Sequence, residues 1–327
     1  MKQLRKLGSN GPAVGAVGYG AMGLEGYYGS TDEDSSVQVI RHALDEGCSM
    51  IDTADAYGNG HNEQLVGRAV ADRREEAFLA TKFGIVFAPD ETGTDVPTGW
   101  GFSLKINGKP EYVRRALENS LERLGTAQID LWYAHYPDPA TPIEETVGAM
   151  SEAVRAGKVR FLGLSNVTAD QIQRAHKVHP IAAVQYEYSL WRREVESELL
   201  PTLRELGIAL VPWSPLGGGF LTGTIDALGA NDFRNNNPRY QGDNFAANKQ
   251  RFEPLMKLAE ELGITAAQLS LAWLLYQGDD IIPIPGTRNP ARVTENAAAA
   301  EIILGMEALE KISGLAAPGT AVGKTLL

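Results

Sequence analysis

Four residues whose side chains could together move a proton lie at or just beyond the ends of short apolar runs. Asp52 and Tyr57 lie in SMIDTADAYG, Lys82 lies in FLATKFG, and His135 ends IDLWYAH. A phenol has an ordinary pKa of about 10, which makes it a poor acid at neutral pH. A nearby ammonium lowers that pKa, a carboxylate can hold the ammonium in place, and a histidine can hydrogen-bond a reacting oxygen. The set is therefore suited to protonating a carbonyl oxygen while a hydride arrives at its carbon.

Each of the four also has an ordinary structural explanation when it is considered alone. The aspartate could cap a turn, the tyrosine could pack within a loop, the lysine could be solvated, and the histidine could be satisfied in the core. Their joint occurrence at the ends of three consecutive apolar runs favours a shared site.

The elements that would position these side chains are short, mostly apolar runs without strict alternation, which is typical of strands buried on both faces. Eight such runs predict strands at Val17–Gly20, Met50–Thr53, Phe78–Lys82, Ile129–His135, Phe161–Ser165, Ala183–Tyr188, Ile208–Trp213 and Ile281–Ile284. Helical patterns lie between most of them, at Asp34–Glu46, Tyr112–Leu124, Ile143–Ala156, Ala169–His179, Leu199–Leu206, Thr265–Tyr276 and Arg292–Ala300.

This alternation predicts an α/β protein, a (β/α)8 TIM barrel with long loops at its C-terminal face. We expect one barrel domain over residues 1–327, with an N-terminal β-hairpin cap at 1–16 and a tail at 316–327. The connections Gly84–Pro110 and Leu216–Lys249 are too long to be simple turns. Both follow a strand, so we expect both at the C-terminal face, where barrel active sites are built.

One motif points to a different fold. Residues 18–23, GYGAMG, match the GxGxxG fingerprint of dinucleotide-binding Rossmann folds. That motif requires the third glycine to open a helix that receives the pyrophosphate. The residues that follow, LEGYYGSTDED, have no helical apolar period. We therefore expect these glycines to make a strand end and a tight turn.

Composition and charge exclude several classes of function. The formal net charge of −11 disfavours a protein that binds nucleic acid or an anionic membrane through a broad basic surface. Cys48 is the only cysteine, so we expect no disulfide and no cysteine-based metal site. The N-terminus lacks the apolar core of a signal peptide and no run reaches membrane-spanning length, so we expect a cytoplasmic protein. No self-associating stripe stands out, which leaves an oligomer possible but unsupported.

The motifs resemble those of the aldo-keto reductases over nearly the whole chain, from GYGAMGLEGYYG to IPGTRNPARVTEN. The likeness is greatest to the long-chain bacterial and plant branch, which includes potassium-channel beta-subunit-like proteins. DTADAYG, ATKFG and DLWYAHYPDP match the family's catalytic motifs. The resemblance therefore implies that Asp52, Tyr57, Lys82 and His135 are catalytic, that no metal takes part, and that the cofactor is NADPH/NADP+.

Further motifs of the resemblance imply the cofactor contacts. GLSNV and VQYEYSL are similar to the stretches that bind the nicotinamide carboxamide, and PWSPLGGGFLTG to the stretch that stacks on the ring and cradles the pyrophosphate. IPGTRNPARVTEN is similar to the adenosine-phosphate end of the site. The residues implied are Ser165, Asn166, Gln185, Trp213 (stacking), Ser214, Leu216, Gly218, Gly286, Thr287, Arg288, Arg292, Glu295 and Asn296.

Two positions depart from the family pattern in this part of the site. The family more often has tyrosine where this chain has Trp213, and the larger indole face should serve equally well. Many members have a lysine where this chain has Gly286. Arg288 could replace that phosphate contact, since a guanidinium fork binds phosphate well. We expect a preference for NADPH, with use of both NADPH and NADH as the main alternative.

The substrate is expected to be a small-molecule carbonyl, whose identity the sequence does not reveal. Aromatic residues near strand ends or in the first long loop are candidate pocket walls, namely Tyr28, Trp100, Tyr136, Tyr188 and Trp191. Two other readings of the chain stay open. One is a cofactor-bound regulatory or redox-sensor subunit with slow turnover, and the other is a metal-free barrel lyase or isomerase.

Overall fold

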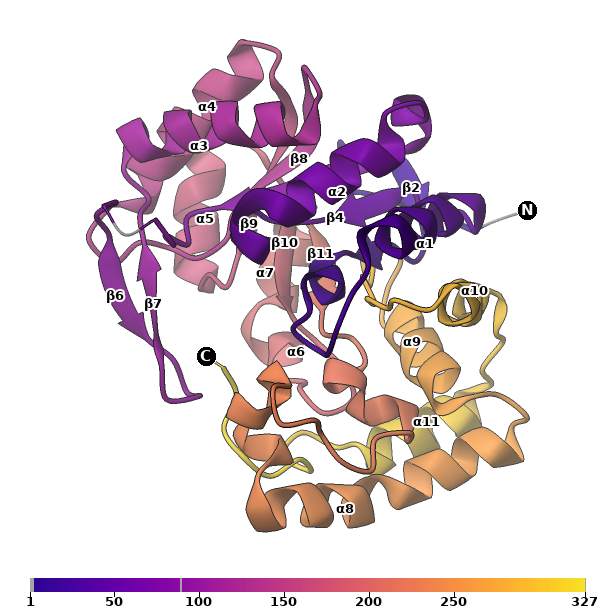
Figure 1. Cartoon of the computed structure of the whole chain (residues 1–327). Coiled ribbons are helices and arrows are strands. Elements are labelled where there is room, and N and C mark those ends of the chain that lie inside the picture. Colours follow the sequence, from indigo (N-terminus) through magenta and orange to yellow (C-terminus); the bar gives the residue numbers. More distant parts are fainter. Residues whose placement is uncertain (1–2, 89, 327) are drawn as a thin grey trace.

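The computed structural model describes residues 3–88 and 90–326, and its centre is a ring of parallel strands inside a layer of helices (Figure 1). The seven strands are hydrogen-bonded in the order β11-β10-β9-β8-β5-β4-β3. Their bounds are β3 Tyr19–Gly20, β4 Met50–Asp52, β5 Phe78–Phe83, β8 Ile129–Ala134, β9 Val159–Ser165, β10 Ile181–Glu187 and β11 Ala209–Trp213. The predicted barrel is confirmed, and the seven strands overlap seven of the eight predicted ones.

The eighth predicted strand, Ile281–Ile284, closes the ring without forming a regular strand. It makes an isolated bridge to Leu210 on β11, and the amides of Ile282 and Ile284 donate to carbonyls of that strand. On the side that faces β3, the carbonyls of Pro283 and Pro285 accept hydrogen bonds from the amides of residues 18 and 20. The two prolines have no N–H with which to donate a hydrogen bond in return. The prediction of a full strand is therefore wrong because two prolines remove half of the hydrogen bonds toward β3.

The helices cover the outside of the ring, and their bounds are α1 Glu33–Asp45, α2 His61–Val70, α3 Pro110–Leu124, α4 Ile143–Arg155, α5 Ala169–Val178, α6 Val195–Glu198, α7 Leu200–Leu206, α8 Gly242–Glu261, α9 Ala266–Tyr276, α10 Pro290–Ala298 and α11 Met306–Leu315. The helical patterns in the sequence did not predict α2, α6, α8 and α11. Outward-facing strand residues such as Leu79, Trp132 and Val184 pack with them in one large buried cluster.

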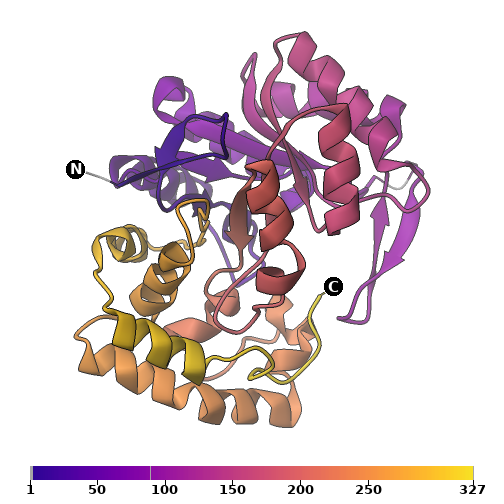
Figure 2. The ribbon, with the colours of Figure 1, turned by 180° about the vertical axis from the view of Figure 1, so that it is seen from behind.

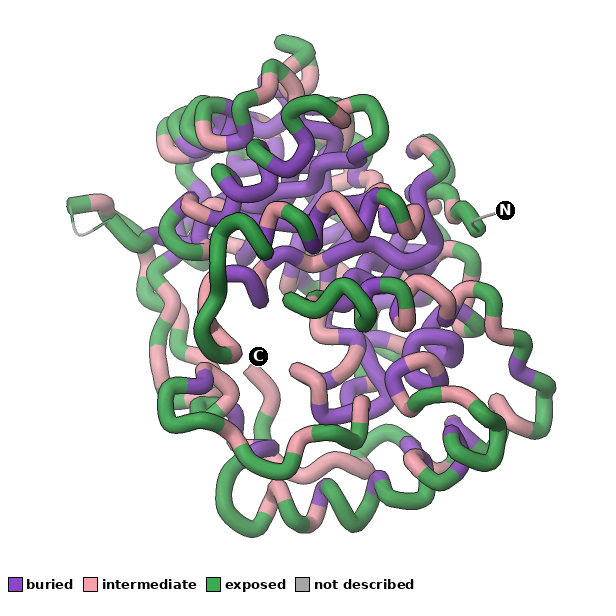
Figure 3. Tube along the Cα trace, turned by 45° about the vertical axis from the view of Figure 1, so that its right-hand side comes forward, coloured by how far each residue is buried: buried purple, intermediate pink, exposed green. Residues whose placement is uncertain are grey.

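A smaller apolar cluster fills the inside of the ring, formed by inward residues such as Met50, Leu131, Ala183 and Val211. The hairpin β1 (Leu4–Lys6) and β2 (Ala13–Gly15) adds Leu7 and Val14 to it. The buried part of the trace accordingly follows the strands, and the exposed part follows the outer helices and loops (Figure 3). In the described chain no helix is long and apolar enough to cross a membrane.

The first long connection, residues 84–110, contains an antiparallel hairpin that the sequence analysis did not predict. Its strands are β6 (Thr94–Pro97) and β7 (Ser103–Ile106), and it projects from one side of the barrel (Figure 1). Seen from behind, the C-terminal end of the chain lies near the hairpin tip (Figure 2). The amide of Gly99, in the tip, donates to the carbonyl of Leu326 at 2.8 Å.

The second long connection is shorter than expected, because α8 already begins at Gly242. Three short 3-10 helices, Gly217–Thr222, Phe233–Asn236 and Pro238–Tyr240, occupy much of it. The GxGxxG segment also behaves as predicted. Gly20 ends β3, and the segment after it forms only a 3-10 helix, Met22–Glu25, so no α-helix starts at Gly23.

Candidate active site

The ammonium of Lys82 lies at the centre of the site, on the inner side of β5 and fully buried. It donates to Asp52 Oδ1 at 2.6 Å, to the carbonyl of Thr53 at 2.7 Å and to the hydroxyl of Tyr57 at 3.3 Å. An ammonium has three protons, so each of them has an acceptor. The pairing of β4 with β5 brings Asp52 and Lys82 together, and the turn between β4 and the 3-10 helix Tyr57–Gly60 returns Tyr57 to the same point.

Both oxygens of the Asp52 carboxylate are held. Lys82 bonds one of them, and Gln185 Nε2, on β10 across the ring, donates to the other at 2.7 Å. Gln185 was predicted to bind the nicotinamide carboxamide, and the structure additionally makes it a support for Asp52. The carboxylate is thus fixed from two sides of the barrel.

His135 follows β8 and completes the cluster of four predicted catalytic residues. Its ring centroid lies 6.0 Å from that of Tyr57 in a T-shaped arrangement, and Tyr136 stacks on it at 5.2 Å. The Nδ1 atom of His135 is buried without a hydrogen-bond partner in the described chain. Burial, and then the charge of Lys82, hold the pKa of His135 well below its ordinary value of 6.5, so the ring is neutral.

The expectation that Lys82 lowers the pKa of Tyr57 is wrong in direction. Burial raises the pKa of this phenol well above 10.0, and the negative charge of Asp52 adds to the rise. Burial is the larger cause of this raised pKa, and Asp52, 2.6 Å from the ammonium, also compensates the positive charge of Lys82. Burial also raises the pKa of Asp52 and lowers that of Lys82, each against the attraction of its partner. Tyr57 is therefore a protonated phenol at neutral pH.

The predicted nicotinamide contacts meet beside His135. Asn166, in a left-handed conformation with φ 57°, donates from Nδ2 to the carbonyl of His135 and to Ser165 Oγ, both at 3.1 Å. Trp213 donates from Nε1 to Asn166 Oδ1 at 3.3 Å and is only half-buried at the end of β11. The structure therefore brings Ser165, Asn166 and Trp213 into one bonded group next to the catalytic residues.

The predicted pyrophosphate stretch turns sharply directly after Trp213. Ser214 adopts φ 50°, its Oγ accepts from the amide of Gly218 at 2.9 Å, and Leu216 precedes the 3-10 helix that starts at Gly217. Arg234 closes this turn from outside by donating to the carbonyl of Gly218 at 2.7 Å.

At the adenosine end, the structure explains why glycine stands at position 286. A Cβ there would lie 2.6 Å from the carbonyl oxygen of Gly20, so a lysine would need the backbone to move. Thr287 is fixed through its carbonyl, which accepts from the Tyr19 hydroxyl at 2.6 Å. Arg288 was predicted to meet phosphate, and in the structure it holds the carbonyls of Tyr28 and Ser30 at 2.9 and 2.5 Å.

The remaining adenosine-end residues lie on α10. Asn289 caps this helix by accepting from the amide of Ala291 at 2.9 Å, and Arg292 follows in the first turn with an exposed side chain. Glu295 is half-buried one turn later and Asn296 is buried beside it. An exposed guanidinium at a helix N-terminus is a suitable place for an anion.

Three of the predicted substrate residues lie toward the mouth of the barrel. Tyr136 packs with Tyr57 and with the hairpin residues Val96 and Leu104. Burial raises the pKa of Tyr28 to about 12, and the Arg234 guanidinium lies 4.8 Å from the centre of its ring. Trp100, at the hairpin tip, contacts Phe233 with ring centroids 5.8 Å apart.

The other two predicted substrate residues are packed elsewhere. Tyr188 is fully buried against Trp273 of α9, and its hydroxyl donates to Glu196. Side chains alternate along a strand, so the residue after the inward-facing Glu187 points to the helices. Trp191 stacks on Phe220 at 4.5 Å and lies over Gly217, within the wall of the second loop. The assignment of Tyr188 as a pocket wall is therefore wrong, and that of Trp191 stays a prediction.

Sequence reasoning named Trp100 as a candidate pocket wall but missed the group of aromatic residues that it joins, which we call the aromatic roof. Phe233 contacts Tyr27 at 5.6 Å, Trp100 at 5.8 Å and Phe102 at 6.1 Å, and its amide donates to the carbonyl of Tyr27 at 2.8 Å. The roof consists of Tyr27, Trp100, Phe102 and Phe233, from three different loops. The only signal in the sequence was the aromatic content of the loops.

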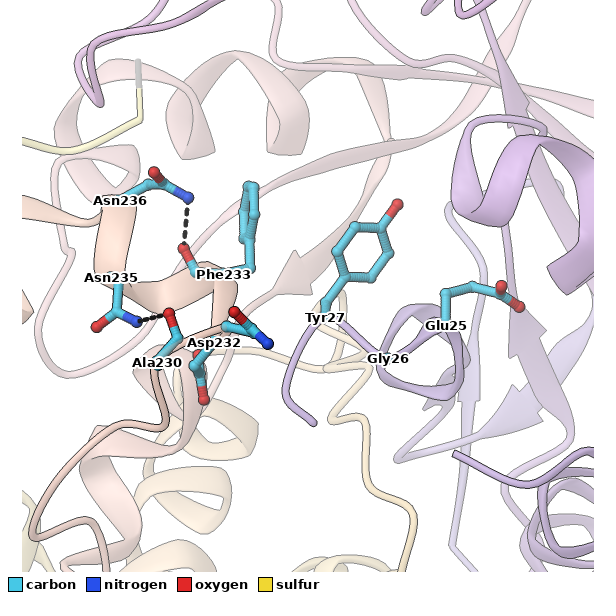
Figure 4. Close-up of a pocket in the computed structure, with 9 residues that line it drawn as sticks. Glu25, Gly26, Tyr27, Ala230, Asp232, Phe233, Asn235 and Asn236 are labelled. Atoms are coloured by element: carbon cyan, nitrogen blue, oxygen red, sulfur yellow. Dashed lines mark hydrogen bonds between the residues drawn. The ribbon is translucent and has the colours of Figure 1, made fainter. Parts of the chain in front are cut away.

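A pocket of about 390 Å³ opens where two of these loops meet (Figure 4). It is lined by Glu25, Gly26, Tyr27, Ala230, Asn231, Asp232, Phe233, Asn235 and Asn236. None of the four predicted catalytic residues lines it, so it adjoins the mouth without being the reaction centre. In the described chain no group of three or more His, Cys, Asp or Glu side chains could hold a metal ion.

Comparisons with known proteins agree with this geometry. Residues 16–317 match the model of the aldo/keto reductase family. The chain is 43% identical over 316 residues to the aldo-keto reductase yakc [NADP(+)] of Schizosaccharomyces pombe, covering 94% of this chain and 89% of the relative. A glycerol dehydrogenase from Gluconobacter oxydans superposes with a TM-score of 0.82 at 30% identity, over 99% of this chain and 98% of that one.

An aldo-keto reductase from Klebsiella pneumoniae, solved in complex with NADPH, superposes with a TM-score of 0.74 at 26% identity and covers the whole of both chains. One family is indicated by the family model, by the sequence identity to yakc and by the barrel fold. The chain belongs to the aldo/keto reductase family of oxidoreductases.

Proposed function

We propose that this chain reduces an aldehyde or ketone to an alcohol with NADPH, and that Tyr57 donates the proton. The observation that carries the proposal is the set of bonds made by Lys82. Its ammonium donates to the oxygen of Tyr57 and is held by Asp52 and by the carbonyl of Thr53. Because the tyrosine oxygen is an acceptor in this bond, its own proton can point away from Lys82, toward a substrate.

The residues of the site divide the work of the reaction. The nicotinamide cofactor, when bound, supplies a hydride to the carbonyl carbon. Tyr57 is protonated at neutral pH, so it can give its proton to the oxygen as negative charge develops there. Lys82 already donates to the tyrosine oxygen and so stabilises the phenolate that remains. His135, neutral and buried, can hydrogen-bond the same carbonyl oxygen and orient it.

The residues present fit a nicotinamide cofactor. Trp213 is half-buried with its indole nitrogen fixed by Asn166, which leaves ring surface for stacking. The glycines 217–219 all have positive φ, and without side chains they allow the backbone to approach a pyrophosphate closely. We assign the contacts at this end to Ser165, Asn166, Gln185, Trp213, Ser214, Leu216 and Gly218.

We assign the 2′-phosphate to the N-terminus of α10, with Thr287 and Arg292, and the adenine edge to Glu295 and Asn296. Arg288 uses only two of its five N–H donors for the carbonyls that it holds, so the other donors remain for a phosphate. The NADP(+) in the name of the yeast relative and the NADPH bound to the Klebsiella protein support this preference. Fluorescence titration with NADPH and NADH tests it, since equal dissociation constants would remove the phosphate assignment.

The replacement Tyr57→Phe tests the proton donor. It keeps the ring and removes the acidic proton, so kcat for carbonyl reduction should fall by about 10² to 10⁴. The dissociation constant of NADPH should stay within about threefold of the wild-type value, because the hydroxyl is not assigned to the cofactor. The measurement is NADPH consumption with a panel of aldehydes and ketones.

The matched control is Tyr136→Phe, which removes a buried phenol stacked on His135. Its kcat should stay within about tenfold of the wild type. Full activity of Tyr57→Phe would remove the assigned donor. No turnover by the wild type on any carbonyl would instead remove the reductase proposal and favour a regulatory protein that only binds the cofactor.

A further inference from the structure

The loop that carries Tyr57 is closed at its base by a hydrogen bond between two buried side chains. Thr53 directly follows β4, Asn62 is the second residue of α2, and Tyr57 lies between them. Thr53 Oγ1 donates to Asn62 Oδ1 at 2.7 Å, and the two residues are only 1% and 0% exposed. Water does not compete for a bond buried in this way, so the bond restrains the base of the loop.

The side-chain amide of Asn62 has only one orientation that suits its partners. Its Nδ2 donates to the carbonyl of Ala21 at 3.1 Å and to Glu25 Oε1 at 2.9 Å. A backbone carbonyl can only accept, so Nδ2 has to face Ala21 and Oδ1 has to face Thr53. In the described chain no side chain caps the start of α2, so these bonds do not serve the end of the helix. Asn62 is therefore an anchor, which the segment after β3 holds in place.

Thr53 joins this anchor to the ammonium of Lys82. Its amide donates to the carbonyl of Ala80 on β5 at 2.9 Å, and its hydroxyl donates to Asn62. Its carbonyl accepts from Lys82 Nζ at 2.7 Å. All three polar groups of Thr53 are thus held, and the residue fixes both the ammonium and the start of the loop that leads to Tyr57.

The rest of the loop depends on this restraint. Residues 58–60 have positive φ values of 57°, 52° and 90°, and one of them is Asn59, for which such a conformation is uncommon. The Tyr57 hydroxyl lies 3.3 Å from Lys82 Nζ, which is the longest of the three bonds of the ammonium. Hydrogen bonds weaken as they lengthen, so a small outward shift of the loop breaks this bond first.

We propose that Thr53 and Asn62 are positioning residues for the proton donor, because their hydrogen bond keeps the Tyr57 hydroxyl within reach of Lys82. This inference rests on the proposed role of Tyr57. Neither side chain is assigned to the carbonyl or to the cofactor. Loss of the bond should therefore slow the chemical step and leave binding nearly unchanged.

The replacement Thr53→Val tests the bond, since it removes the hydroxyl and keeps the shape of the side chain. The rate of hydride transfer in a single turnover, normalised to the NADPH-binding sites titrated, should fall by about tenfold to hundredfold. The dissociation constant of NADPH and KM for the carbonyl should stay within about threefold of the wild-type values. Thr53→Ser, which keeps the hydroxyl, should recover most of the rate. A defect that only lowers the folded fraction cancels in the normalised rate.

The matched control is Thr81→Val. Thr81 Oγ1 donates to Glu63 Oε1 at 2.6 Å, and both residues are fully buried. Glu63 follows Asn62 on α2, so the two threonines bond to adjacent residues of one helix, but only Thr53 lies at the base of the loop that carries Tyr57. Thr81→Val should lower stability and leave the normalised rate of hydride transfer unchanged.

A second measurement needs no turnover. Amide hydrogen exchange of residues 54–61 should be about tenfold faster in Thr53→Val than in the wild type, the factor expected when a buried hydrogen bond is lost, and unchanged in Thr81→Val. An unchanged rate of hydride transfer in Thr53→Val overturns the inference, as does an equal loss in Thr81→Val. Unchanged exchange in Thr53→Val also overturns it. Faster exchange in Thr53→Val alone, in a protein that reduces no carbonyl, would keep the restraint on the loop and reject only the proposed reduction.

Discussion

The two sides of the active site are held together by different forces. The catalytic residues Asp52, Tyr57, Lys82 and His135 form a floor at the ends of β4, β5 and β8, where the ammonium alone makes three hydrogen bonds of 2.6 to 3.3 Å. The aromatic roof is held by ring contacts of 5.6 to 6.1 Å and one backbone hydrogen bond. Directional bonds on strands fix geometry, whereas ring contacts between loops tolerate displacement.

This difference indicates that turnover and substrate binding can be changed separately, by substitutions in the floor and in the roof. A substitution in the floor should alter turnover and stability together, because the same buried charges serve both. A substitution in the roof should alter how the substrate and the cofactor are retained, while the chemical step stays nearly the same.

The largest effect is expected from Lys82→Met in the floor. It leaves the Asp52 carboxylate buried without its charge partner, which should lower the free energy of unfolding by about 3 to 5 kcal/mol. Turnover should be lost as well, because the phenolate of Tyr57 would no longer be stabilised. Urea denaturation and single-turnover kinetics measure the two effects.

The double variant Asp52→Asn with Lys82→Met separates the two consequences. It removes both charges, so most of the stability should return while turnover stays absent. If Lys82→Met were as stable as the wild type, the ammonium and carboxylate would not form the buried pair described above.

A smaller effect is expected from Phe233→Ala in the roof. The change removes three aromatic contacts from a half-buried residue and leaves the catalytic residues untouched. KM for the carbonyl should rise by about fivefold to tenfold, and kcat should stay within about threefold. Steady-state kinetics at saturating NADPH measures both.

The control for the roof is Phe161→Ala, an aromatic residue half-buried on β9, which packs on Phe78 at the inner cluster. It should lower stability without a selective rise in KM. A fall in kcat as large as that of Lys82→Met would show that the roof takes part in the chemistry, and the distinction between the two sides would be lost.

The sequence predicted that the four residues of the floor meet, and of the roof it predicted only Trp100, for physical reasons. Asp52, Lys82 and His135 follow apolar strands, and the parallel barrel forces such strand ends to one face, so their meeting follows from topology. Phe233 meets Trp100 and Tyr27 through contacts between loops far apart in the chain, and no local pattern encodes those contacts.

Two errors within the barrel have equally definite causes. Tyr188 was assigned to the pocket because it follows a strand end, but the alternation of side chains turns it to α9 and leaves Glu187 facing inward. The pKa of Tyr57 was expected to fall because the effect of Lys82 was considered without burial and without the compensating charge of Asp52.

The smallest predicted effect is on the pH dependence of the free energy of unfolding, which should differ between a floor variant and a roof variant. The pKa of His135 is well below 6.5 in the folded protein, whereas a histidine of the unfolded chain takes up a proton at about pH 6.5. Below pH 6.5 the unfolded state binds one more proton than the folded state. The wild type should therefore lose up to about 1.4 kcal/mol of stability per pH unit through this residue as the pH falls below 6.5. Above pH 6.5 this residue should cause no loss of stability. His135→Gln lacks this loss, so the wild type should lose stability relative to that variant between pH 7 and pH 5.5.

Phe233→Ala, which removes no titratable group, should differ from the wild type by the same free energy across that range. A pH-independent difference for His135→Gln would mean that the folded protein protonates His135, and the floor would then be open to solvent in the way that we attribute to the roof alone.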